Sequence, residues 1–326
     1  MSQPLLEVQD LAIRIRGTGR NLVDGVSFGV MPGETLCIVG ESGCGKSLTA
    51  LALMGLLASP PLEIAGGKAL FQGQDLLGLT RAQFSRLRGD RLAMIFQEPM
   101  SALNPALRIG EQIAESVRRH RGASHRAARA RALEMLEKVR IPAPETRLDE
   151  FPHQLSGGMR QRAMIAMALA NDPALIVADE PTTALDVTIQ AQILDLMRRL
   201  RDEAGTALIM ITHDLGVVAE MADKVAVMYA GRVVETGTMA QVFGDPQHPY
   251  TIGLMSSMPA FGAGAGRLVT IPGMVPPISA MPPGCRFASR CPFRLPRCEA
   301  PPPLVQAGDH QAACWRAPLD ALEVTA

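Results

Sequence analysis

The stretch "GESGCGKS", Gly40 to Ser47, decides the fold. It follows the strand-like run "TLCIV" and leads into "KSLTALALMGLLA", which is apolar almost all round, like a helix packed inside an α/β domain. Its glycines let backbone N–H groups turn toward phosphates, and the helix N-terminus adds a favourable dipole. We expect Lys46 to neutralise β- and γ-phosphate charge and Ser47 to bind Mg²⁺. A glycine turn that holds no nucleotide is the alternative for this motif alone.

A second motif, "ALIVADEP", places two carboxylates at the end of an apolar strand. A buried core does not tolerate such carboxylates without a charged partner. Asp179 suits Mg²⁺ coordination, and Glu180 suits polarising an attacking water. The alternative is a strand that ends in a solvated acidic turn. Because phosphoryl transfer needs both a phosphate cradle and a Mg²⁺ carboxylate, the two motifs together predict a nucleotide-hydrolysing site.

Composition limits the function classes. The chain has 326 residues and 47% hydrophobic content, which favours two domains over one. Lys plus Arg and Asp plus Glu are both 32, so no excess positive charge supports a general nucleic-acid binder. The start "MSQPLLEVQD" does not resemble a signal peptide, and no apolar run approaches the ~18 residues of a membrane span. We therefore expect a protein that stays where it is made, in a reducing compartment where disulfides are rare.

The order of patterns along the chain predicts an α/β fold. Short β-rich runs separated by Gly and Pro occupy residues 5–39, and strand-like runs return at "ALIVAD", "ALIMIT" and "VAVMYAGRVVETG" between helical segments, which indicates a mostly parallel sheet. A helical pattern at about 100–170 predicts an inserted helical subdomain. One helix there has an expected buried face, formed by Ala128, Ala132, Met135, Leu136 and Val139.

The C-terminal quarter differs in composition from the rest. Prolines accumulate after about residue 245, and regular periodicity fades. The expected division is therefore a nucleotide-binding domain over 1–245 and a small, irregular, Pro- and Cys-rich domain over 246–326.

Five motifs in a fixed order identify a family. "GESGCGKS", "FQEP", "LSGGMRQR", "ADEPTTALD" and "ITHD" together resemble the nucleotide-binding subunit of ABC transporters, over residues 1 to about 245. The resemblance implies an ABC-type P-loop NTPase core, in which an antiparallel β subdomain accompanies the mostly parallel sheet. It also implies an ATPase that closes as a head-to-tail dimer with two ATP molecules at the interface. One subunit's phosphate loop and the other's "LSGG" motif would hold each ATP.

The resemblance also implies roles for single residues. Gln97 would sense Mg²⁺ and the attacking water, and His213 would hydrogen-bond the γ-phosphate, although an isolated His after a strand is more often structural. Glu180, His213, Gln97 and Lys46 form the predicted catalytic set, and Ser47, Gln97 and Asp179 the predicted Mg²⁺ set. The expected contacts to ATP in the same subunit are Gly40, Ser42, Gly43, Cys44, Gly45, Lys46, Ser47 and Leu48. The expected contacts to ATP on the partner are Ser156, Gly157 and Gly158.

Two further positions follow from the resemblance. Asp186 would run along the dimer interface and couple the two sites. Ile15 stands in the region where the family commonly stacks an aromatic side chain on the adenine, so the adenine contact is left open.

Within the family, the chain resembles ATPases of bacterial oligopeptide, dipeptide and nickel importers. The residues that carry this are "LTALALMGLL", "MIFQEPMSALNP" and "HPYTIGLMSSMP". The resemblance implies a D-type ATPase subunit at the cytoplasmic face of the inner membrane, with a related F-type ATPase, two permeases and an external solute-binding protein, and no nucleic acid. The alternatives are a nickel or other small-solute importer, or a soluble ABC ATPase without a permease.

Four cysteines form a separate group near the C-terminus: Cys285, Cys291, Cys298 and Cys314. Small domains with few apolar residues usually need a metal or crosslink, and four thiolates fit either zinc or an iron–sulfur cluster. The spacings exceed the usual zinc knuckle, which favours a cluster. The resemblance to the peptide-importer ATPases implies a 4Fe-4S cluster here. Zinc, or free thiols in a flexible tail, are the alternatives.

Overall fold

The computed structural model describes residues 3–183, 187–256, 271–308 and 310–319. Asp186 lies outside the described residues. The chain divides into two compact units. The first consists mainly of Gly78–Ile211, and the second combines Leu6–Gly29, Thr35–Leu77 and the chain from Thr212 onward. This grouping brings the C-terminal quarter into the same unit as the phosphate loop, and the predicted boundary at residue 245 stays a prediction.

The first unit is built on three parallel strands. They are β6 (Leu92–Ile95), β7 (Leu175–Asp179) and β8 (Ala207–Thr212), with β7 in the middle. Every residue of β7 is buried, which explains why its sequence is apolar up to the final residue, Asp179. In register, Asp179 lies beside Ile211 of β8. The parallel arrangement that the sequence predicts is confirmed for these strands.

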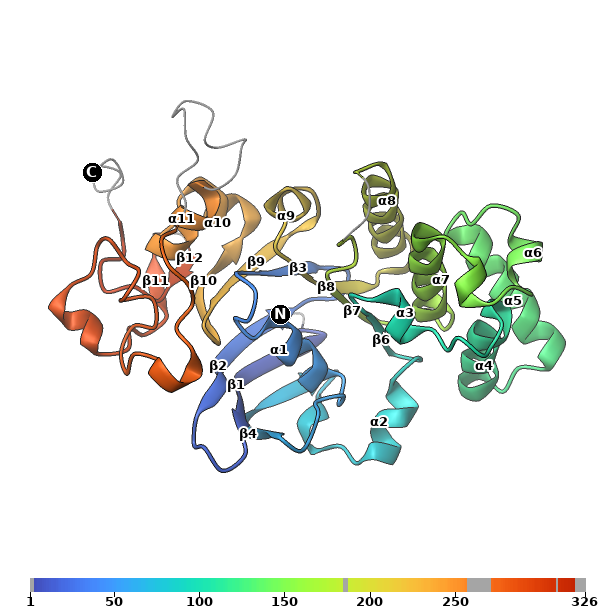
Figure 1. Ribbon diagram of the computed structural model, residues 1–326, viewed down its shortest axis with the longest axis horizontal. Helices are drawn as coiled ribbons and strands as arrows, with labels where there is room; N and C mark the ends of the chain where they lie inside the picture. The colour runs from blue at the N-terminus through green and yellow to red at the C-terminus, as the bar shows by residue number, and fades with distance from the viewer. Residues whose placement is uncertain (1–2, 184–186, 257–270, 309, 320–326) are drawn as a thin grey trace. The chain divides into compact units, whose positions relative to one another are not determined.

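Helices fill most of the first unit (Figure 1). Their bounds are α2 (Arg81–Leu87), α3 (Pro99–Ala102), α4 (Ile109–Arg121), α5 (His125–Lys138), α6 (Pro144–Arg147), α7 (Gly157–Leu169) and α8 (Val187–Ala204). A 3₁₀ turn at Pro152–Gln154 leads toward α7. The predicted apolar face of α5 is confirmed, because the five side chains named for it are all buried. That face packs against α4 and α7.

The second unit contains two sets of strands (Figure 1). An antiparallel sheet has the order β2 (Asn21–Val30), β1 (Leu6–Ile15), β4 (Leu62–Phe71) and β5 (Gln74–Asp75). In the other set β3 (Thr35–Val39) runs parallel to β9 (Lys224–Tyr229), followed by antiparallel β10 (Arg232–Thr238), β12 (His310–Ala312) and β11 (Val305–Ala307). The helices are α1 (Lys46–Leu53), α9 (Leu215–Met221), α10 (Met239–Gly244) and α11 (Pro249–Ser256), with 3₁₀ turns at Leu76–Gly78, Ile278–Ala280 and Pro296–Glu299. The predicted α/β fold with parallel strands and an antiparallel subdomain is confirmed.

A buried carboxylate attaches the C-terminal region to this unit. Glu235 of β10 is fully buried and accepts hydrogen bonds from the backbone N–H groups of Gln247 (2.6 Å) and His248 (3.0 Å). The ring Nε2 of His310 in β12 lies 2.7 Å from the same carboxylate. Hydrogen bonds to a charged group contribute about 1.5–3 kcal/mol each, so Glu235 is a strong anchor for both segments.

Candidate nucleotide-binding and catalytic site

The phosphate loop connects β3 to α1 and depends on its glycines. Gly40 has φ +150° and Gly45 has φ +102°, which only glycine adopts readily. A Cβ at Gly40 would lie 2.1 Å from the carbonyl oxygen of Met228 in β9. The backbone therefore requires glycine at both positions. The glycine-dependent loop between a strand and a helix, which the sequence predicts, is present.

Lys46 lies inside this loop and is almost fully buried. Its Nζ donates to the carbonyl oxygens of Gly40 (2.7 Å) and Glu41 (3.1 Å), and the Cys44 sulfur lies 3.8 Å away. Lys46 thus supplies a positive charge fixed in position by the loop itself. A bound anion would gain more from such a charge than from one on a mobile surface side chain.

The acidic motif lies at the end of β7 in the first unit. Asp179 is buried, and Glu180 has φ +47°, in the left-handed region. Oε2 of Glu180 accepts hydrogen bonds from Nε2 of Gln97 (3.1 Å) and Oγ1 of Thr183 (2.8 Å). The structure therefore brings Gln97 and Glu180 together, although 83 residues separate them. A carboxylate held in this way keeps a fixed orientation for a water molecule.

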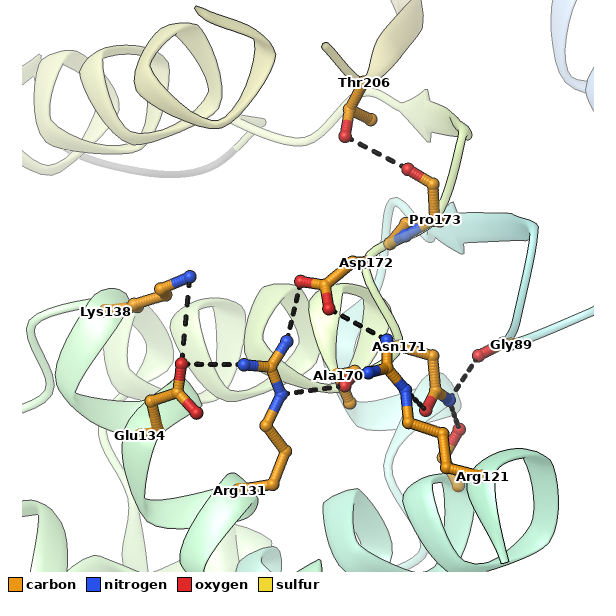
Figure 2. A network of polar contacts seen from close by, with 11 residues as sticks. Gly89, Arg121, Arg131, Glu134, Lys138, Ala170, Asn171, Asp172, Pro173 and Thr206 are labelled. Atoms are coloured by element: carbon orange, nitrogen blue, oxygen red, sulfur yellow. Dashed lines mark hydrogen bonds and ion pairs between the residues drawn. The ribbon is translucent and has the colours of Figure 1, made fainter. Parts of the chain in front are cut away.

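The turn between α7 and β7 fixes the start of the acidic strand (Figure 2). The Asp172 carboxylate accepts from Arg121 of α4 (2.8 Å) and from Arg131 of α5 (2.7 Å). The neighbouring Asn171 amide donates to the carbonyl oxygen of Gly89 (2.6 Å). This network ties two helices to the segment that leads into Asp179. Sequence reasoning missed it, because charged residues on helices carry no marker of their distant partners.

The "LSGG" motif forms the start of α7. Ser156 is the N-cap, and its Oγ accepts from the backbone N–H of Met159 at 3.3 Å. Gly157 and Gly158 occupy the first turn, where backbone N–H groups have no partner within the helix. Further along the helix, the buried Gln161 side chain donates to the carbonyl oxygen of Pro181 at 2.6 Å. Gln161 therefore links this helix to the residue that follows Glu180, and its burial could not be read from the sequence.

The remaining predicted residues belong to the second unit. His213 follows β8 directly and is exposed, next to Asp214, which caps α9 by accepting the N–H of Gly216 at 2.8 Å. Ile15 ends β1 opposite Leu62. A pocket of about 540 Å³ lies beside the phosphate loop. Leu22 of β2 is among the residues that line it, and Ile15 is not. Neither unit by itself holds the whole predicted catalytic set.

The four C-terminal cysteines line one small cavity in the second unit. Burial raises the pKa of the Cys291 thiol to about 11, and it also raises the pKa values of Cys285 and Cys314. Backbone N–H groups approach two sulfurs: that of Leu295 lies 3.4 Å from Cys298 and that of Arg316 lies 3.4 Å from Cys314. The cysteines are thus neighbours, not scattered thiols of a tail.

These cysteines are not arranged as a preformed metal site. Within the described part of the chain, no three His, Cys, Asp or Glu side chains are disposed to hold a metal ion. The ligand set predicted for a 4Fe-4S cluster, Cys285, Cys291, Cys298 and Cys314, therefore stays a prediction, and the structure places these residues around one cavity lined by thiols. Protonated thiols behave as small apolar groups. They pack less closely around a common centre than thiolates that bind a metal ion.

Comparison with known proteins decides the family. A model described as "ABC transporter" matches residues 23–183, and one described as "Oligopeptide/dipeptide transporter, C-terminal region" matches residues 234–298. The chain belongs to the ABC transporter ATP-binding family. The oligopeptide transport ATP-binding protein OppD of Bacillus subtilis is 50% identical over 325 residues, which is 98% of this chain and 91% of that protein.

Other similarities agree with this ABC assignment. One similar protein is from Brucella abortus and is named as a peptide import ATP-binding protein. It is 50% identical to this chain, and the match covers 95% of this chain and 94% of that protein. Among solved structures, the dimeric ATP-binding cassette MJ0796 bound to ADP and Pi has a TM-score of 0.64 and 28% identity, covering 72% of this chain and 98% of that one. No helix among the described residues of this ABC protein is both long and apolar enough to cross a membrane.

Proposed function

We propose that this chain is the ATP-hydrolysing subunit of an ABC transporter that imports peptides. The observation that carries the proposal is the match to OppD over 98% of the chain, C-terminal region included. The fixed positive charge of Lys46 and the Gln97–Glu180 pair are the groups that ATP hydrolysis requires. ATP hydrolysis itself follows from membership of the family.

The proposed mechanism assigns a task to each group. The phosphate loop and Lys46 bind the phosphates, while Ser47, Gln97 and Asp179 would hold Mg²⁺, which neutralises charge that develops on the γ-phosphate. Glu180 accepts a proton from the attacking water, and His213 hydrogen-bonds the γ-phosphate and orients that water. Ser156, Gly157 and Gly158 complete the site of the partner subunit through free N–H groups at the start of α7. Hydrolysis then depends on closure of the dimer.

The partners follow from the same proposal. A second, F-type ATPase subunit would complete the two shared sites, and two permeases would form the path through the membrane. We infer a peripheral position at the cytoplasmic face of the membrane, with an external binding protein that delivers the peptide. We further propose that residues 1–245 form the ATPase domain and residues 246–326 an accessory domain. Purification of the tagged chain from solubilised membranes should recover both permeases, and their absence would contradict the importer.

We further propose that the four C-terminal cysteines bind a 4Fe-4S cluster. It is supported by the common cavity of the four thiols and by the N–H groups near the sulfurs of Cys298 and Cys314, since hydrogen bonds to sulfur stabilise thiolates. The raised pKa of Cys291 means that binding must release a proton from that thiol. A cluster is a bulky group and spaces its ligands more widely than a single zinc ion.

Iron and sulfide analysis tests the cluster directly. Protein purified without oxygen should contain iron and acid-labile sulfide, and Cys291→Ser should lose most of both. Cys37→Ala is the matched control, because Cys37 is buried in β3 away from the four thiols. Stoichiometric zinc without iron, or no metal at all, would contradict the proposal.

A further inference from the structure

A pocket of about 540 Å³ lies against the phosphate loop within the second unit. Three residues of the loop, Glu41, Ser42 and Gly43, contribute to its lining. A ligand in the pocket would therefore touch the loop that is proposed to hold phosphates. The volume is within the range of sites that enclose small organic ligands, about 300–1,000 Å³.

The other walls of this pocket are mostly apolar. Leu22, at the start of β2, provides one wall. The Pro-rich segment Gly273–Met281 provides the other and contributes Val275, Ile278 and Met281 among its side chains. We name this segment the proline wall. Its side chains offer flat or aliphatic surface without charge, which suits the face of a heterocyclic base and not a phosphate.

The proline wall is attached to the phosphate loop by one buried arginine. The Arg290 side chain is only 6% exposed, and its Nη1 donates to Oε2 of Glu41 at 2.8 Å. Its other nitrogens donate to the carbonyl oxygens of Pro272 (2.9 Å) and Gly273 (3.1 Å), where the wall begins. One planar guanidinium thus bridges the loop and the wall, which a lysine could not do.

Two more contacts hold the same parts. The Tyr250 hydroxyl accepts the backbone N–H of Glu41 at 2.8 Å, so Glu41 is fixed through both backbone and side chain. At the far end of the wall, Arg20 donates to the carbonyl oxygen of Ile278 at 3.0 Å. The pocket therefore has fixed walls on both sides, and the residue from the first strands that lines it is Leu22 and not Ile15.

We propose that Leu22 and the proline wall bind the adenine base of ATP, and that Arg290 positions this wall on the phosphate loop. This proposal rests on the proposed ATPase function. It identifies the residues that contact the adenine, which the sequence alone left undecided. Aliphatic side chains replace the aromatic platform, and the C-terminal region becomes part of the nucleotide site. Substitutions in the proline wall should thereby change ATP affinity.

Binding of ATP and of inorganic triphosphate, both with Mg²⁺, separates the base from the phosphates. The double variant Val275→Ser/Ile278→Ser should weaken ATP binding by about tenfold, because two aliphatic contacts are lost, and change triphosphate binding less than about twofold. The matched control is Val305→Ser/Ile64→Ser, which changes the same residue types at exposed positions of the same unit. The control should bind both ligands like the unmodified chain.

The outcomes distinguish the two levels of proposal. Unchanged ATP affinity in the wall variant, or an equal loss for ATP and triphosphate, would overturn the base site and leave the ATPase intact. Binding of neither ligand by the unmodified chain would sink the proposed function itself, and the base site with it.

The proposed role of Arg290 is tested by the ratio of ATP affinity to triphosphate affinity, which a general loss of stability would not change. Arg290→Gln should weaken ATP binding more than triphosphate binding, whereas Arg290→Lys should recover only part of the difference. Arg294→Gln is the control, because Arg294 is more than half exposed in the same segment. A lowered melting temperature with an unchanged ratio of the two affinities would show that Arg290 only stabilises the fold.

Discussion

Replacing Glu180 with Gln is expected to reduce ATP turnover by about two to four orders of magnitude, the usual contribution of a general base. The amide keeps the size of the side chain and can still accept a hydrogen bond from Gln97, which lies 3.1 Å from Oε2. It cannot accept a proton from water. ATP affinity should therefore stay within about threefold, and ATP should accumulate in a closed dimer with the partner subunit.

Steady-state ATPase rates and nucleotide affinity, measured on the same preparation, check this expectation. Glu137→Gln makes the same chemical change on an exposed position of α5 and should keep the full rate. A Glu180→Gln protein that turns over ATP at the normal rate would show that another group accepts the proton.

Replacing Lys46 with Met is expected to lower the affinity of the chain for ATP strongly. The variant removes a buried charge whose Nζ is held by the carbonyl oxygens of Gly40 and Glu41. Hydrogen bonds to charged groups contribute about 1.5–3 kcal/mol each, so losing the contacts proposed between Lys46 and the β- and γ-phosphates should weaken ATP binding by about a hundredfold or more.

The loop should survive this substitution because Glu41 has independent anchors in Tyr250 and Arg290. Thermal melting without nucleotide checks the fold, and titration with Mg-ATP gives the affinity. Lys68→Met is the control, since Lys68 is exposed on β4 of the same unit. Near-normal ATP affinity of Lys46→Met would mean that the phosphates bind elsewhere.

Local patterns predicted the parts of the fold that local chemistry dictates. The glycines of the phosphate loop are required by positive φ at Gly45 and close approach at Gly40, and both requirements were visible as spacing in the sequence. The buried face of α5 follows from helical periodicity. Strand β7 is apolar from Leu175 to Ala178 because every residue of the strand is buried, and only its last residue, Asp179, is charged.

Contacts between distant segments could not be predicted in this way. Arg290 and Glu41 are 249 residues apart, and neither residue indicates the other. The same holds for Gln161 and Pro181, where a polar side chain inside a helix finds a backbone partner. The cysteine spacing led to the prediction of a cluster held by four thiols. The four thiols do line one cavity, but no preformed metal site is present among the described residues, because side-chain arrangement does not follow from spacing alone.

Peptide uptake into proteoliposomes shows whether this chain powers peptide import. The vesicles would contain this chain, its partner ATPase and both permeases, with ATP on the side of the ATPases and labelled peptide with the binding protein on the other. Peptide uptake should require ATP hydrolysis and should be abolished by Glu180→Gln in this chain. Uptake of nickel but not peptide, or peptide uptake that continues with Glu180→Gln, would contradict this prediction.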